Sequence, residues 1–177
     1  MTTVTVQSKE AVLTRQKLGA LCDIVRGSSP RPKSDPRFYG GPVPRLMVSD
    51  LTRDGMFVTP RTDSLTEEGA RKSRPMRRGD LVIAVSGAPG LPAILETDCC
   101  IHDGFVGLRD LDTTRVVPEF LFRFLNHIRE VNSNSAVGAI FKNLTSDQVR
   151  DITLPLPPLH EQKRIAITAN LALPALR

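Results

Sequence analysis

The sequence contains too little cysteine to build a disulfide framework. Only three cysteines occur among 177 residues, and two of them, Cys99 and Cys100, are adjacent. An odd number of thiols without regular spacing is typical of an intracellular protein whose cysteines stay reduced. We therefore expect a cytoplasmic location, with the cysteines packed in the fold.

Long apolar runs are also missing. No stretch is long and apolar enough to cross a bilayer. The first residues, Met-Thr-Thr-Val-Thr-Val-Gln, lack the basic start and the apolar stretch of a signal peptide. We therefore expect no membrane among the partners of this chain.

Motifs that would carry chemistry are equally scarce. The segment 87–90, Gly-Ala-Pro-Gly, lacks the lysine and hydroxyl residue of a phosphate-binding loop, so we predict a turn. Cys99, Cys100 and His102 lack the second pair of ligands that zinc sites use. Neighbouring strand residues also point to opposite faces, so both thiols cannot easily reach one ion. We expect no metal, no cofactor and no catalysis in this chain, and a small nuclease or hydrolase is the less favoured alternative.

What the sequence does have is concentrated positive charge. Residues 26–78 contain 12 Lys and Arg against 6 Asp and Glu, whereas the rest of the chain contains 12 against 13. The formal excess of +5 therefore comes from one segment. A basic surface of this kind is typical of proteins that contact nucleic-acid phosphates, although a solubilising loop could have the same composition.

The residue patterns predict an α+β domain. Short apolar runs bounded by turn residues indicate strands at 46–50, 55–59, 81–85, 92–95, 105–108 and 152–156. Helical spacing predicts a helix over 118–128, and two capping boxes predict short helices over 65–72 and 145–149. Pro158 suits the first turn of a last helix running towards Pro174. This mixture is typical of a small mixed or antiparallel sheet with short helices.

A long segment over 26–45 interrupts these elements. It contains five of the fourteen prolines, three of the twelve glycines and five basic residues. Long loops in compact domains are commonly functional, so we expect an irregular, loop-built binding face here. Along the chain we expect a flexible N-terminal segment over 1–17, the domain itself over 18–157 and the start of a C-terminal helix over 158–177.

Several phrases occur in an order that resembles one known family. They are Leu18–Pro30, Phe38–Pro44, Val48–Leu51, Arg78–Ile83, Cys100–Phe105, Pro118–Leu121, Phe141–Leu144 and Glu161–Ala166. Together they resemble the target recognition domain of type I restriction-modification specificity subunits, over about residues 18–170. One phrase departs from the family: Cys100-Ile-His-Asp103 stands where a small residue followed by Asn-Gln-Asp is usual.

The resemblance implies an adaptor that recognises double-stranded DNA sequence. Such a subunit would direct an adenine methyltransferase subunit, which binds S-adenosylmethionine, and a restriction subunit to target DNA. Family subunits usually carry two recognition domains joined by long helices, so this chain is similar to a single-domain or half-subunit form. Two copies could pair, or a second specificity half could complete the subunit. The alternative is a protein-interaction module of a related defence system without its own DNA reading.

The residues expected to contact DNA lie in loops or at strand ends. Phosphate contacts are predicted for Arg31, Lys33, Arg37, Arg74, Arg77, Arg78 and Lys142. Arginine reads guanine and asparagine reads adenine through paired hydrogen bonds. Base contacts are predicted for Arg31, Arg45, Ser49, Asp50, Arg53 and Asn143. Docking of a partner subunit on the C-terminal helix is predicted for Leu159, Gln162, Arg164 and Ile165.

Overall fold

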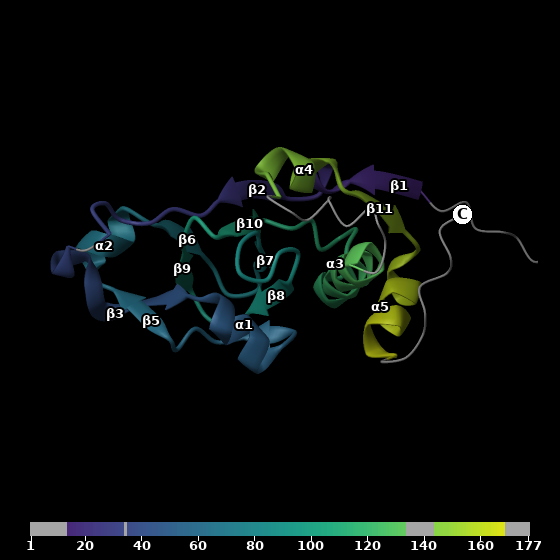
Figure 1. Ribbon diagram of the computed structural model, residues 1–177. Helices are drawn as coiled ribbons and strands as arrows, with labels where there is room; N and C mark the ends of the chain where they lie inside the picture. The colour runs from purple at the N-terminus through teal and green to yellow at the C-terminus, as the bar shows by residue number, and fades with distance from the viewer. Residues whose placement is uncertain (1–13, 34, 134–143, 169–177) are drawn as a thin grey trace, which may run out of the picture.

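The computed structural model describes residues 14–33, 35–133 and 144–168. These residues fold into an α+β domain of short strands and short helices, as predicted. Two sheets occupy its centre, and a separate pair of strands joins the two ends of the described chain (Figure 1). Within the described ranges no helix is long and apolar enough to span a membrane.

The larger sheet has five strands in the order β2–β10–β7–β8–β4. Its strands are Asp23–Arg26 (β2), Phe57–Val58 (β4), Leu81–Ala84 (β7), Pro92–Leu95 (β8) and Phe105–Arg109 (β10). Neighbours are antiparallel except for β4 and β8, which are parallel. The predicted strands at 81–85, 92–95 and 105–108 are confirmed, and a shorter strand forms within 55–59.

The smaller sheet has four strands in the order β5–β3–β9–β6. Its strands are Tyr39–Leu46 (β3), Asp63–Leu65 (β5), Arg74–Met76 (β6) and Cys99–Ile101 (β9). Strands β3 and β9 are parallel, and the other pairs are antiparallel. A 3-10 turn at Pro36–Phe38 and helix α2, Glu67–Arg71, lie beside this sheet at one end of the molecule (Figure 1).

Alternate residues of the central strands face two separate hydrophobic cores. On one side, Leu81 packs with Phe120 of helix α3, Pro118–Ser133. On the other side, Val82 packs with residues of the smaller sheet and of helix α1, Val48–Asp54. Because both faces are covered, the central strands are continuous apolar runs, which made them easy to predict. The larger sheet is thus the rigid support for the surface loops.

The two ends of the described chain meet. Four elements lie here: β1, Thr14–Lys17; α4, Ser146–Asp151; β11, Thr153–Leu156; and α5, Leu159–Ile167. Strand β1 is antiparallel to β11 (Figure 1). The capping box at Thr145 is confirmed, because its hydroxyl accepts a hydrogen bond from Gln148 N while the Gln148 side chain accepts one from Thr145 N. The predicted helix over 118–128 and strand over 152–156 are also confirmed.

Two predictions for the basic segment are wrong. Residues 26–45 are not one irregular loop, because 39–46 form β3. Its prolines are tolerated because the pairing with β5 shifts register between Tyr39 and Val43, and because β9 pairs only with the last two residues. Residues 48–50, predicted to belong to a strand, begin helix α1 instead.

The helix predicted over 65–72 begins later than expected. The capping residue is Thr66, whose hydroxyl accepts a hydrogen bond from Gly69 N at 3.1 Å. Leu65 instead ends strand β5, where it is buried. Tertiary burial of one leucine therefore decides where the strand stops and the helix starts.

The two ends of the domain also differ from prediction. Residues 14–17 form β1, so this part of the 1–17 segment is an ordered strand. The last helix begins after Pro158 and ends at Ile167, because Thr168 adopts an extended backbone with φ −82° and ψ 103°. The expected continuation towards Pro174 is thus interrupted, and 169–177 lie outside the described residues.

Candidate nucleic-acid interface

The loop that follows β2 is fixed against the turn between β9 and β10. Gly27 N donates a hydrogen bond to Phe105 O at 3.0 Å, and Ser28 N donates one to Ile101 O at 3.1 Å. A Cβ on residue 27 would collide with the carbonyl oxygen of His102. Glycine is therefore required where the loop crosses this turn, and the basic residues beyond it start from a fixed point.

Asp103, in the β9–β10 turn, holds two cations of this loop. Its Oδ1 accepts a hydrogen bond from Ser29 Oγ at 2.6 Å. Its Oδ2 lies 3.1 Å from Arg31 Nη2 and 3.7 Å from Lys33 Nζ. The hydrogen bond from Ser29 lowers the pKa of Asp103, and the two cations add to this effect against partial burial. A charged carboxylate therefore stands between two predicted phosphate contacts.

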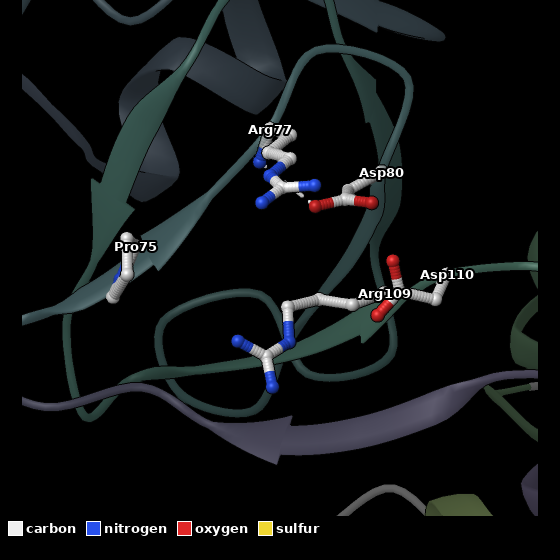
Figure 2. A pocket seen from close by; sticks show the side chains of 5 residues that line it. All are labelled: Pro75, Arg77, Asp80, Arg109 and Asp110. Atoms are coloured by element: carbon white, nitrogen blue, oxygen red, sulfur yellow. Dashed lines mark hydrogen bonds between the residues drawn. The ribbon is translucent and has the colours of Figure 1, made fainter.

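A pocket of about 270 Å³ opens beside β6 and β10 (Figure 2). It is lined by Pro75, Arg77, Asp80, Arg109 and Asp110. Figure 2 shows the side chain of Arg77, in the loop just after β6, and that of Arg109, the last residue of β10. Arg109 also donates to Asp23 of β2 at 2.6 Å. Burial raises the pKa of Asp80, and the pocket combines two arginines with two carboxyl groups.

The basic side chains around this pocket and in the loop come from neighbouring segments of the fold. Arg74 Nε donates to Arg26 O at 3.0 Å, and Ser73 Oγ donates to Ser28 O at 2.7 Å, so β6 lies against β2 and its loop. We define the cationic ridge as Arg26, Arg31, Lys33, Arg74, Arg77, Arg78 and Arg109. The sequence missed Arg26 and Arg109, because only the pairing of β2 with β10 brings them to the others.

Three further predicted contacts are already paired with acids. The ion pairs are Arg37 with Asp35, Arg45 with Asp63, and Arg53 with Asp50 and Asp54, at nitrogen–oxygen distances of 2.5 to 2.9 Å. Only 12% of the Arg45 side chain is exposed, so its charge compensates Asp63 and leaves little surface for a base. Arg77 and Arg78, by contrast, are exposed, and within the described part of the chain their guanidinium groups show no ion pair.

Asp50 is fully buried, which contradicts its assignment as a base contact. Its carboxylate accepts hydrogen bonds at 2.7 to 3.1 Å from Met47 N, Arg53 Nη1, Arg61 N and Thr62 Oγ1. Burial raises the pKa of Asp50, but these hydrogen bonds outweigh it and hold the pKa below its ordinary value. Asp50 thus fastens the loop at 59–62 to α1, and it brings exposed Ser49 within 3.2 Å of Thr62.

Lys142 and Asn143 lie outside the described residues. Leu144 follows them and is buried, and its carbonyl oxygen accepts a hydrogen bond from Arg26 Nη1 at 3.3 Å. The described chain therefore resumes beside β2 and the cationic ridge. The contacts predicted for Lys142 and Asn143 stay predictions.

Gln162 is buried within the fold, which contradicts its assignment to partner docking. Its Oε1 accepts a hydrogen bond from Val117 N at 2.8 Å, and its Nε2 donates to Arg115 O and Pro157 O at 2.9 Å. The side chain therefore ties α5 to the start of α3. Of the other docking candidates, Leu159 and Ile165 are half-buried, and exposed Arg164 pairs with Glu161.

The substitution Gln162→Ala should detach α5 from α3. It leaves one buried N–H and two carbonyl oxygens without their partner, so we expect a loss of about 2 kcal/mol in the free energy of unfolding, measured in urea. Lys163→Ala, an exposed neighbour on the same helix, is the control and should change stability by less than about 0.5 kcal/mol. Equal stabilities for the two variants would contradict the anchoring role.

The cysteine and histidine group has the properties of core residues. Cys99 and Cys100 are buried in β9, and burial raises the pKa of both thiols, which keeps them protonated. His102 Nδ1 accepts a hydrogen bond from Gly104 N at 2.9 Å, and the ring lies edge-on to Phe105. No group of three or more His, Cys, Asp and Glu side chains among the described residues could hold a metal ion.

Fold and surface together define an α+β domain with a cationic face built on a buried sheet. Residues 14–168 match the family described as "Type I restriction modification DNA specificity domain". The chain therefore belongs to this family of type I DNA specificity domains. The resemblance found in the sequence is thus confirmed.

Individual relatives agree with this family. The chain is 34% identical to the MjaX type I restriction enzyme specificity subunit of Methanocaldococcus jannaschii over 87 residues, which are 49% of its length. It is 22% identical to the MjaIX specificity subunit of the same organism over 156 residues, which are 85% of its length. The crystal structure of the HsdS subunit from Thermoanaerobacter tengcongensis matches with a TM-score of 0.66 and 25% identity over 91% of the chain. A chain from a structure of the type I R-M system matches over the same share with a TM-score of 0.69 and 25% identity.

The chain covers only part of each of these proteins. It spans 20% and 35% of the two curated subunits and 37% and 38% of the two solved chains. The chain therefore spans less than two fifths of the length of each of these proteins.

Proposed function

We propose that this chain recognises DNA sequence as the specificity subunit, or half of one, of a type I restriction-modification system. The observation that carries the proposal is membership of the DNA specificity family over 14–168, combined with the cationic ridge that β2, β6, β10 and their loops supply. In this role the chain is a non-catalytic adaptor. It positions DNA in the cytoplasm for an adenine methyltransferase subunit, which supplies S-adenosylmethionine, and for a restriction subunit.

The cationic ridge supplies the phosphate contacts in this proposal. Its cations come from β2 and β10 of the larger sheet, from β6 of the smaller sheet, and from the adjoining loops. Base reading then falls to exposed side chains such as Ser49, Arg53 and Arg61, on the platform that Asp50 holds together beside β4, at the opposite edge of the larger sheet from β2. Arg61 is exposed and was not among the sequence predictions.

Removing two free cations tests the phosphate role. Arg77→Ala with Arg78→Ala should weaken binding to a mixed-sequence duplex about tenfold at low salt. The slope of log K against log salt should become shallower by nearly 2, because each phosphate contact contributes about 0.9. Fluorescence anisotropy over a salt series measures both quantities.

The control removes the same charge elsewhere. Arg115→Ala with Lys163→Ala takes two exposed cations from outside the ridge. This variant should keep the wild-type slope. If both double variants lost affinity equally, net charge and not the cationic ridge would determine binding.

The sequence-reading role needs a separate experiment. The chain is co-expressed with an adenine methyltransferase subunit, and methylated adenines are mapped across the host genome. We expect methylation within one recurrent sequence that disappears when the chain is omitted. Co-purification without sequence-dependent methylation would instead identify an interaction module.

A further inference from the structure

Asp103 places a carboxylate beside two cations of the cationic ridge, which is unexpected on a surface that binds DNA phosphates. One carboxylate oxygen, Oδ1, is taken by the hydroxyl of buried Ser29 at 2.6 Å. The other oxygen, Oδ2, faces both Arg31 and Lys33, at 3.1 and 3.7 Å, and 40% of the Asp103 side chain is exposed. A single exposed anionic oxygen therefore sits between two cations, as a phosphate oxygen would.

We propose that Asp103 acts as an internal substitute for a DNA phosphate, which occupies Arg31 and Lys33 in the free protein and so suppresses binding to non-specific DNA. This inference rests on the proposed function, and it assigns a specificity role to a residue that contacts neither a base nor a reacting atom. A phosphate can take these cations only by displacing Oδ2 or by accepting its repulsion. Non-specific DNA gains only phosphate contacts. Competition from Asp103 therefore removes a larger share of its binding free energy than it removes from a cognate site, which also gains base contacts.

The surroundings of Asp103 keep the carboxylate in place. Ser29 is buried and also accepts a hydrogen bond from Arg45 Nη2 at 3.2 Å, which fixes its hydroxyl. Arg45 in turn is paired with Asp63, so its charge is not available to neutralise Asp103. The carboxylate is thus anchored from beneath by a neutral hydroxyl, and its charge is directed outward to the two loop cations.

The other surface features discussed for the described residues do not define one ligand or partner. The pocket beside Arg77 contains two acids as well as two cations, and this mixture of charges does not favour one class of ligand. The exposed side chains of Phe57, Val131 and Ile167 lie on separate elements, and nothing indicates what would cover them. Asp103 is the feature in which distance, charge and exposure point to one role.

The substitution Asp103→Asn tests the inference with the 177-residue chain and a mixed-sequence duplex. The amide oxygen can still accept the hydrogen bond from Ser29, but the negative charge is gone. We expect non-specific binding to tighten about three- to tenfold and the salt slope to steepen by about 1, because one more phosphate contact becomes available. Asp103→Glu keeps the charge and should bind as the wild type does.

Two further variants isolate the mechanism. Asp151→Asn removes the same charge from an exposed ion pair with Lys17, a residue that is not part of the cationic ridge, and should leave affinity unchanged. Adding Arg31→Ala and Lys33→Ala to Asp103→Asn should abolish the gain, because the released cations are then absent. Asp103→Ser is a second charge-removing variant, and it should show the same gain as Asp103→Asn.

Each outcome separates this inference from the proposed function. Suppose that the wild type binds DNA and Asp103→Asn binds equally or more weakly, or that Asp151→Asn gains as much affinity as Asp103→Asn. Either result overturns the role of Asp103 and leaves the proposed function standing. Failure of both Asp103→Asn and Asp103→Ser to fold would show a structural carboxylate and would overturn it too. Absence of DNA binding in every variant overturns the proposed function, and this inference falls with it.

Discussion

Replacing Gly27 with alanine should destabilise the domain by about 3 kcal/mol, because a Cβ at this position meets the backbone carbonyl of His102. The oxygen belongs to the turn that carries Asp103 and cannot move without disturbing β9 and β10. The loop bearing Arg31 and Lys33 would be displaced at the same time. Urea unfolding of the purified variant measures the change in stability.

A second glycine provides the control. At Gly19 a Cβ would meet the Cγ, Cδ and Cβ atoms of Arg150, and because this side chain is exposed a change of its χ1 rotamer can move Cγ and Cδ away. Gly19→Ala should therefore cost less than about 1 kcal/mol. If Gly27→Ala were as stable as Gly19→Ala, the loop would not be fixed to the β9–β10 turn as described.

Replacing Asp50 with alanine should cost about 4 kcal/mol, which is the other large effect. The substitution removes the acceptor of two backbone N–H groups, one hydroxyl and one guanidinium, all donated to a fully buried carboxylate. Asp50→Asn should cost less, because an amide oxygen at Oδ1 still accepts three of these hydrogen bonds. Ser49→Ala, which loses one exposed hydroxyl contact, is the control and should be nearly neutral.

The effect of Asp50 should depend on pH in one direction. The folded protein holds the pKa of this carboxyl below the ordinary value of 3.8. Its contribution is therefore complete above pH 3.8, and it disappears as the pH falls through the lower, folded-state pKa. The stability difference between wild type and Asp50→Ala should narrow below pH 3.8 in urea titrations. A constant difference down to acid unfolding would contradict this assignment.

The central strands could be predicted because their cause is local. Residues 81–84 and 92–95 are apolar without interruption, since each face of the sheet meets a hydrophobic core. The helix over 118–133 was recognisable for the same reason, because its apolar residues share one face. Where burial is continuous along the chain, sequence pattern and structure agree.

The remaining errors involve residues whose partners could not be identified from the sequence pattern. Asp50 and Gln162 looked like surface residues, but each satisfies buried backbone groups that no local pattern reveals. The strand at 39–46 was hidden by its prolines, and its existence depends on pairing with β5 and β9. Buried polar side chains are chosen for their hydrogen-bond partners, so only the fold identifies them.

The candidate site could likewise be predicted only in part from the sequence. The sequence located the basic segment, but it could not distinguish paired cations such as Arg37 from free ones such as Arg77. It also placed Asp103 only within a family phrase, without indicating that Arg31 and Lys33 share one of its oxygens. The charge of a segment can be counted in a sequence, whereas its availability to a ligand depends on geometry.

The pairing of β1 with β11 has a consequence for how such a domain can evolve. Because Thr14 lies opposite Leu156 in this ladder, the polypeptide arrives and departs about one strand spacing apart. The residues between these two points therefore form a region whose two ends lie side by side at the β1–β11 strand pair. Exchanging that region for another with the same strand pair and the same α3 surface against α5 would give a new binding preference, while the flanking chain kept its position.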